Sequence, residues 1–276
     1  MRSRRYRGIE GEGSSYDLSI SDLMAALCCV FVLFTIGITT SLKEKNMAAN
    51  RYNETKVQIA DEIENVLKAE CKGVNVTFNK DRLILQFSAD RAFEEGKPYL
   101  KDGFKEDLSK IFPAIMRALY NSDKRDDIEE IRIEGFTATD RSDNNEHDEE
   151  YNNPYIQSFR SYGEGSDHDY ITGFTLSQQR TMHVLSYCML TNYMKDIPKE
   201  ERDVYKKWVR EHVSASGYSY TRPLDEEGKE ITLEEQNLMN DKQKQISKNQ
   251  SRRVEFRIKT NADRVVKDLQ TKKDNY

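Results

Sequence analysis

The sequence predicts an α+β protein that consists of one N-terminal membrane helix, a helical connector and a domain of strands and helices outside the membrane. The first observation is an uncharged run from Leu23 to Leu42, about 20 residues, which is just long enough to cross a bilayer. The second is the polarity of the whole chain, with 33% charged residues and a mean hydropathy of −0.84. The third is a mixture of alternating and helical apolar patterns after residue 71, which is typical of strands and helices in one domain.

The N-terminus reads as a short tail, residues 1–20, followed by a transmembrane helix at 21–42. No small-x-small cleavage site follows the apolar run, so we expect a retained anchor and not a removed signal peptide. Residues 41–60 carry as many basic residues as the tail, and the charge balance across the helix is therefore nearly even. The short, arginine-clustered tail favours a cytoplasmic N-terminus and a C-terminal domain in the periplasm of a bacterium, with a single pass through the inner membrane.

Residues 43–70 are predicted to form a polar helical connector. An incomplete apolar stripe runs along it at helical spacing, and it includes Val57, Ile59 and Ile63. The stripe, which continues at Val66 or Leu67, is enough for pairing with a second copy of the chain.

The domain at 71–276 is predicted to place its helices on one face of a sheet. Alternating patterns predict a hairpin around 79–81, a strand that ends at Gly135, a strand and turn within 210–223 and a final strand within 251–260. Helices are expected at 100–120, where Pro113 should bend the helix, near 199–210 and at 232–247. A further helix is predicted to begin at a capping box formed by Thr175 and Gln178.

Several classes of function are disfavoured by the sequence. The net charge of −5 argues against nucleic acid as a direct partner. There is no nucleophile elbow, P-loop or clustered His/Cys set, so we expect neither an enzyme nor a metal site. An acidic insertion at 140–172 is expected to be a solvated loop, because it lacks the spacing of an EF-hand. Cys71 and Cys188 leave two alternatives open, a disulfide or two buried thiols.

Three segments of the domain resemble the OmpA-like peptidoglycan-binding family. Residues 131–140 resemble its strand and following loop, and 176–189 resemble its Leu-Ser-x-x-Arg helix. The turn at 216–223 with the strand at 249–258 resembles its closing motif. An N-terminal helix joined to such a domain is the layout of MotB-like stator subunits. Within them the segments are most similar to the ZorB group of the Zorya anti-phage defence system.

This resemblance implies a wall-binding site with Thr137, Asp140, Arg180 and Arg252 as its residues. In the family, a loop carboxylate and the helix arginine hold the charged ends of the diaminopimelate unit of peptidoglycan. Here Ala138 occupies the position of that carboxylate. Asp140 takes over, or the wall is bound more weakly, or Ala138 is an engineered change. For Arg252 and its neighbour, a ligand contact and a simple alternation of charges out of a half-buried strand stay open.

The resemblance also implies that Asp22, next to Ser21, carries the coupling ion, a proton or a sodium ion, with no other cofactor. In such a motor, a MotA-like (ZorA-like) membrane subunit forms a ring around two copies of this chain. Ionisable groups in membrane segments are functional by default, but a carboxylate that merely caps the helix dipole is the alternative. The expected function is a peptidoglycan-anchored, ion-driven motor in antiviral defence. A flagellar-type stator and a static tether between membrane and wall are the other hypotheses.

Overall fold

The structure is a computed structural model that describes residues 13–94, 96–138, 166–191 and 193–261. The chain divides into two compact units, Met1–Arg51 and Tyr52–Tyr276, and each is described by itself. The predicted α+β class, with an apolar N-terminal helix and a domain of strands and helices, is confirmed.

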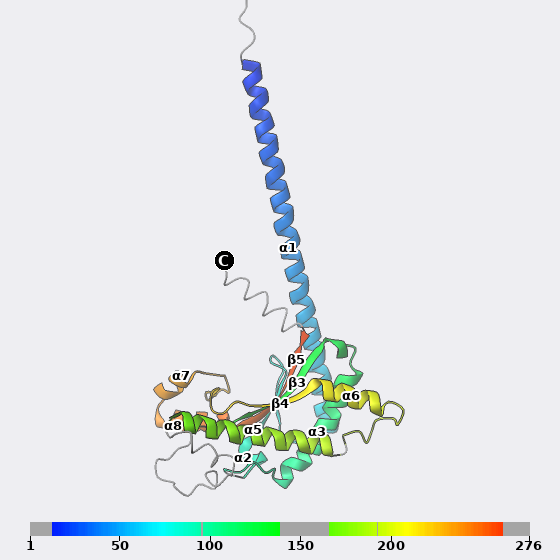
Figure 1. The fold of residues 1–276 in the computed structure, drawn as a ribbon, viewed down its shortest axis with the longest axis vertical. Helices are drawn as coiled ribbons and strands as arrows, with labels where there is room; N and C mark the ends of the chain where they lie inside the picture. The colour runs from blue at the N-terminus through cyan, green and yellow to red at the C-terminus, as the bar shows by residue number, and fades with distance from the viewer. Residues whose placement is uncertain (1–12, 95, 139–165, 192, 262–276) are drawn as a thin grey trace, which may run out of the picture. The chain divides into compact units, whose positions relative to one another are not determined.

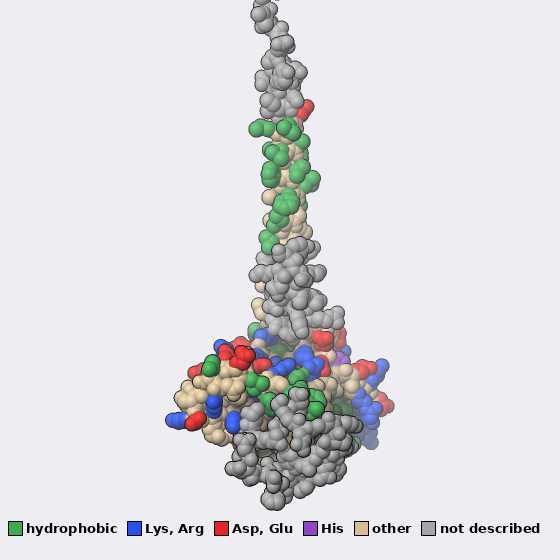
Figure 2. Space-filling view, turned by 60° about the vertical axis from the view of Figure 1, so that its left-hand side comes forward, with side chains coloured by type: hydrophobic (Ala, Val, Ile, Leu, Met, Phe, Trp, Pro, Cys, Tyr) green, Lys and Arg blue, Asp and Glu red, His purple; other side chains and the backbone are tan. Residues whose placement is uncertain are grey.

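The first unit contains most of a single long helix, α1 (Gly13–Glu70). Its segment Asp22–Lys43 has a mean hydropathy of 2.4 over its most apolar window, and none of it is buried. Figure 2 shows hydrophobic side chains along this stretch of the helix. Of the helices in the described part of the chain, this is the one that is long and apolar enough to cross a membrane.

The second unit is built on a five-stranded sheet in the order β1-β2-β5-β3-β4. The strands are β1 (Thr77–Asn79), β2 (Ile84–Ser88), β3 (Ile128–Phe136), β4 (Val213–Gly217) and β5 (Arg253–Thr260). β3 and β4 are parallel, and all other pairs are antiparallel. β5, the last strand in the sequence, is therefore the central strand, and Figure 1 shows it in red beside the green β3.

Helices cover one face of this sheet. They are α2 (Ala89–Ala92), α3 (Asp102–Asn121), α5 (Ser166–Leu190) and α6 (Arg202–His212). Two further helices, α7 (Leu233–Leu238) and α8 (Asp241–Ser251), follow β4, and a short 3-10 helix, η1 (Arg125–Asp127), precedes β3. The apolar stripe of α3 is fully buried, and Phe112 packs edge-on against Phe256 of β5. Val184 of α5 and Trp208 of α6 join the same core. Pro113 lies inside α3, as expected from the sequence.

The last turns of α1 belong to this core. The prediction that their apolar stripe pairs with a second copy of the chain is therefore wrong. Ile59 and Ile63 are completely buried within the sheet unit of the same chain. Val57, the first member of the stripe, stays exposed. The stripe is thus used within one chain, because the sheet unit offers it an apolar surface, and it no longer supports pairing of two copies.

The predicted capping box of α5 is also wrong. The helix begins at Ser166, so Thr175 lies well inside it. The side-chain oxygen of Gln178 instead accepts a hydrogen bond from the backbone N–H of Gly217, at 2.8 Å. The residues between 166 and 174 continue the helix toward its N-terminus, and Gln178 turns to the sheet.

The alternatives for the two cysteines of the domain are resolved in favour of buried thiols. Cys71 and Cys188 are both buried and form no disulfide. Burial raises the pKa of the Cys71 thiol to about 11 and raises that of Cys188 as well. Both side chains therefore act as small apolar core residues.

Candidate functional site

A pair of glycines brings α5 against the C-terminal ends of β3 and β4. Gly135 and Gly217 face each other in the parallel register. A Cβ atom on Gly135 would lie 2.8 Å from the backbone oxygen of Ser177, and one on Gly217 would lie 2.4 Å from the backbone nitrogen of Gln178. Any larger residue at either position would push the helix away, so the two glycines set the distance between helix and sheet.

The turn after β4 is fixed to α5 by side-chain hydrogen bonds. Ser219 is fully buried and has a positive φ of 54°, which is uncommon for a residue other than glycine. Its N–H donates to the hydroxyl of Ser177 at 3.1 Å, and its own hydroxyl donates to the carbonyl of Tyr170 at 3.2 Å. A strained backbone that is held from several sides is typical of functional sites.

Thr137, one of the predicted wall-binding residues, lies at this junction. Its N–H donates to the carbonyl of Ser219 at 2.9 Å, and its side chain is buried. The hydroxyl oxygens of Thr137 and Thr172 are both buried and have no hydrogen-bond partner among the described residues. Buried polar atoms without partners cost free energy, so the junction retains unused capacity to hydrogen-bond a ligand.

Arg180 lies about one turn after Ser177 in α5, and it contacts the segment that follows α2. Its Nε donates to the carbonyl of Lys97 at 3.1 Å, and a terminal nitrogen donates to that of Glu94 at 3.4 Å. The guanidinium also lies 4.9 Å from the centre of the Phe93 ring. Arg180 therefore holds the loop that follows α2.

Arg252 contacts the beginning of the same segment from the other side. Its guanidinium is 3.9 Å from the carboxylate of Asp90, and its carbonyl accepts from the N–H of Ala89. The neighbouring Arg253 is almost completely buried, with its Nε bonded to Glu255 and its guanidinium 3.8 Å from the centre of the Phe136 ring. Arg252 is thus the more accessible of the two. Residues 89–97 are contacted by both predicted arginines, whereas Thr137 contacts the turn at Ser219.

Asp140 and Asp22 are the two remaining predicted site residues. Asp140 and most of the acidic insertion lie outside the described residues, and Ala138 is half-buried just before them. Asp22 is exposed at the start of the apolar segment, and Ser21 precedes it in the same helix. Because α1 begins at Gly13, Asp22 lies more than two turns inside the helix. The helix dipole acts mainly on the first turn, so this position favours a role for Asp22 other than capping.

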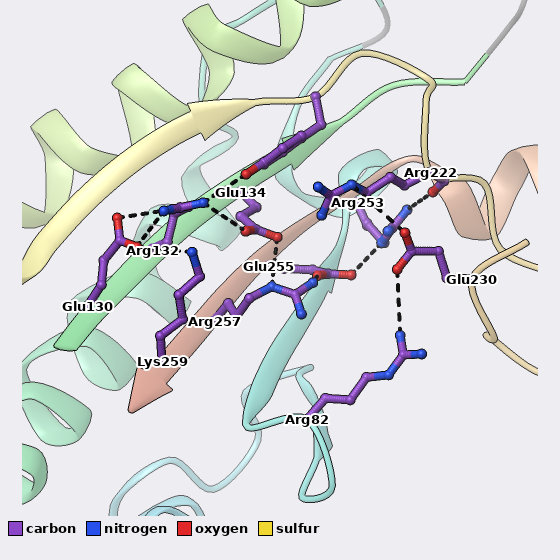
Figure 3. Close-up of polar contacts among 11 residues, drawn as sticks. Arg82, Glu130, Arg132, Glu134, Arg222, Glu230, Arg253, Glu255, Arg257 and Lys259 are labelled. Atoms are coloured by element: carbon purple, nitrogen blue, oxygen red, sulfur yellow. Dashed lines mark hydrogen bonds and ion pairs between the residues drawn. The ribbon is translucent and has the colours of Figure 1, made fainter. Parts of the chain in front are cut away.

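A ladder of charged residues covers the face of the sheet opposite the helices (Figure 3). It alternates along β3 and β5 and consists of Glu130, Arg132, Glu134, Arg253, Glu255, Arg257 and Lys259. Burial alone would raise the pKa of Glu130, but hydrogen bonds from Arg132, Ser214 and Lys259 outweigh it and lower the pKa to about 2. The ladder was not predicted as a unit, although its alternation of charge with apolar residues was visible in the sequence.

The residues that hold the junction were also missed, namely Ser177, Gln178, Thr172 and Ser219. Ser177, Gln178 and Ser219 lie in segments that the sequence analysis singled out, but the residue types did not show that their side chains hold the turn to the helix. The glycines at 135 and 217 were the available hint, because glycine at the end of a strand often marks a close approach of another element.

The chain was compared with known proteins. No family model matches it. It is 30% identical over 258 residues to the Zorya protein ZorB of Escherichia coli (strain ATCC 8739, Crooks), and the match covers 91% of each chain. Among solved structures, a MotB-like protein from Desulfovibrio vulgaris is 16% identical and covers 75% of this chain and 92% of its own, with a TM-score of 0.41. The periplasmic domain of Helicobacter pylori MotB is 13% identical over 70% of this chain and 85% of its own, with a TM-score of 0.35. The identity to ZorB and the extent of that match show that this chain belongs to the Zorya protein ZorB family.

Proposed function

We propose that this protein is the peptidoglycan-anchored subunit of an ion-driven motor in the bacterial inner membrane that acts in anti-phage defence. The observation that carries the proposal is membership of the ZorB family along nearly the whole chain. The partners that we infer are a MotA-like (ZorA-like) membrane subunit that forms a ring, a second copy of this chain at its centre, and the cell wall. The role is mechanical, and no catalytic step is assigned to the chain.

The ion-carrying role is assigned to Asp22, with Ser21 as a neighbouring hydrogen-bonding group. The position of Asp22 inside α1, at the head of a segment that is apolar enough to span a membrane, supports this role. A membrane potential supplies about 2.3 kcal/mol per charge per 100 mV. Protonation of Asp22 would cancel its charge and let the surrounding ring step past it, and release of the proton would engage the ring again. Sodium would act in the same way by direct pairing with the carboxylate.

The wall-binding role is assigned to the junction at Thr137 and to the arginines that contact residues 89–97. The unpartnered hydroxyls of Thr137 and Thr172 support a polar ligand at the junction. Arg180 and Arg252 supply positive charge, and Asp140 is the nearest acid to the position that Ala138 occupies. These groups suit a wall peptide that carries both an ammonium and a carboxylate.

A static tether is the second candidate, and one observation favours it. Asp22 lies at the first position of the apolar segment, where a charge is tolerated more easily than at the centre of a bilayer. A tether would need the anchor and the wall site, but no titrating group in the membrane.

Substitution of Asp22 separates the two candidates. In cells that carry the complete defence system, Asp22→Asn should abolish protection against phage while the membrane complex still assembles, and Asp22→Glu should retain part of the protection. Glu54→Gln, an exposed acid of the same helix outside the apolar segment, is the matched control and should protect like the parent. Full protection by Asp22→Asn would contradict the motor and leave the tether.

A further inference from the structure

A polar cavity of about 250 Å³ lies at the end of the sheet away from the wall-binding junction. It is formed by the turn between β1 and β2, the last residues of β5 and the segment before α7. The polar residues that line it are Lys56, Asp81, Arg82, Glu230, Arg257 and Thr260. Thr260 pairs with Ile128 at the start of β3, whereas Phe136 at the end of β3 lies next to the junction. The cavity is therefore separate from the site described above.

Arg257 is held in place by two buried carboxylates. Its Nε donates to Glu134 and one terminal nitrogen donates to Glu255, each at 2.9 Å. The side chains of Glu134 and Glu255 are only 1% and 5% exposed, so they cannot reorient without losing these bonds. The other terminal nitrogen of Arg257 makes no hydrogen bond within the described part of the chain, and Figure 3 shows it turned away from both acids. An arginine edge that is fixed and unused is organised in advance for an anion.

Arg82 is the second donor on the cavity wall. Its guanidinium lies 3.8 Å from the carboxylate of Glu230, and the other oxygen of Glu230 is 3.8 Å from Arg222. Both distances exceed that of a hydrogen bond, so Glu230 attracts the two arginines but does not saturate either of them. Figure 3 shows Arg82 pointing toward Glu230 from the β1–β2 turn.

The cavity wall carries charges of both signs. Lys56, Arg82 and Arg257 are basic, and Asp81 and Glu230 are acidic. The cavity therefore offers hydrogen-bond donors for an anion and, on the same wall, carboxylates that can accept from an ammonium or hydroxyl group.

We propose that this cavity binds a phosphate ester that also carries an ammonium or hydroxyl group. The phosphate would lie between the guanidinium groups of Arg82 and Arg257 with Lys56 nearby. The ammonium or hydroxyl end would then be received by Asp81 and Glu230. A phospholipid headgroup and a free phosphate ester share this chemistry, and the volume of the cavity accommodates either group.

The test uses the full-length protein in a phosphate-free sugar detergent, with O-phosphoethanolamine as the probe and calorimetry as the measurement. The parent protein should bind the probe, and Arg82→Gln should bind it at least about tenfold more weakly. Arg125→Gln is the matched control, because Arg125 is similarly exposed (42% against 45%) and lies outside the cavity. It should bind like the parent. All three proteins should unfold at the same temperature, since neither arginine belongs to the core.

Competition then identifies the source of the ligand. Short-chain phosphatidylethanolamine, added below its micelle concentration, should displace the probe if the natural ligand is a lipid. If it does not displace a probe that still binds, a soluble phosphate ester is the ligand. Absence of probe binding to the parent, or equal binding by Arg82→Gln, would overturn the proposed site. Neither result would bear on wall binding or on Asp22.

Discussion

At the scale of single residues, Arg180 combines a structural role with a proposed role in wall binding. Its guanidinium donates to the carbonyls of Glu94 and Lys97 and packs on Phe93, so it has a structural role whether or not a ligand is bound. The same side chain is the cation that the resemblance assigns to the wall peptide. A substitution that only removes the charge would confuse the two roles, and a graded pair of substitutions is needed.

Arg180→Ala should weaken co-sedimentation of the full-length protein with purified peptidoglycan and also lower its unfolding temperature. The part-buried carbonyls of Glu94 and Lys97 lose their donor, which costs about 1 kcal/mol. Arg180→Lys should keep more of the stability but lose most of the wall binding, because lysine cannot donate two parallel hydrogen bonds to a carboxylate. Arg210→Ala, on the exposed face of α6, is the control. Wall binding by Arg180→Lys equal to that of the parent would remove Arg180 from the site.

Ala138→Asp should tighten wall binding if the position in front of the acidic insertion serves the same purpose as in the family. Ala138 is half-buried directly after Thr137, so an added carboxylate would lie next to the unpartnered hydroxyl. The measurement is the fraction of protein that sediments with peptidoglycan at several wall concentrations. An unchanged fraction would favour Asp140 as the acid of the site.

At the scale of elements, the contact of α5 with β3 and β4 depends on glycine. Gly217→Ala should destabilise the protein by about 2–3 kcal/mol, because the added methyl group meets the backbone of α5 and not a movable side chain. Gly103→Ala, where nothing lies within 4 Å of the added atom, should be neutral or slightly stabilising. Urea unfolding of the two variants measures the difference. Equal stability of the two would show that α5 can shift at little cost.

The charged ladder should make stability depend on pH in the acid range. The pKa of Glu130 is lowered to about 2 in the folded protein, so its contribution is present above pH 4.5 and is lost as the pH falls toward 2. Glu130→Gln should reduce stability at pH 7 by about 1–2 kcal/mol, after allowance for solvent screening, and should flatten the loss between pH 4.5 and 2. Glu129→Gln, its exposed neighbour, is the control. An unchanged acid slope in Glu130→Gln would contradict the role of the ladder.

The elements that could be predicted from the sequence are those whose patterns are local. The stripe of α3 and the alternation of β5 each lie within one segment, and the structure buries them as expected. The start of α5 and the partners of Arg180 could not be predicted in this way. The carbonyl of Lys97 is 83 positions from Arg180, and nothing in either segment encodes that contact. The same limit applies to the stripe of α1, whose period was visible but whose partner surface was not.

At the scale of the whole molecule, orientation and copy number stay predictions. An alkaline phosphatase fused after residue 270 should be active in cells, because we expect the C-terminal end in the periplasm. A cytoplasmic reporter at the same position should be silent, and the opposite pattern would reverse the proposed topology.

Two copies of this chain are expected in each complex with the ring-forming partner. Since the stripe of α1 is buried within its own chain, the pairing must use other surfaces. Native mass spectrometry of the purified membrane complex counts the copies, and a single copy would contradict the proposed motor.

The central place of β5 has a consequence for how the protein is made. Residues 253–260 are synthesised after every other strand, yet they join β2 to β3. Until they emerge, the earlier strands form two separate pieces with open edges, and unpaired edges invite wrong partners. The domain can therefore close only after residues 253–260 have been translated. A chain that ends before residue 253 would keep the apolar helix but would have no closed sheet, so it would carry the segment proposed to span the membrane without the folded domain proposed to bind the wall.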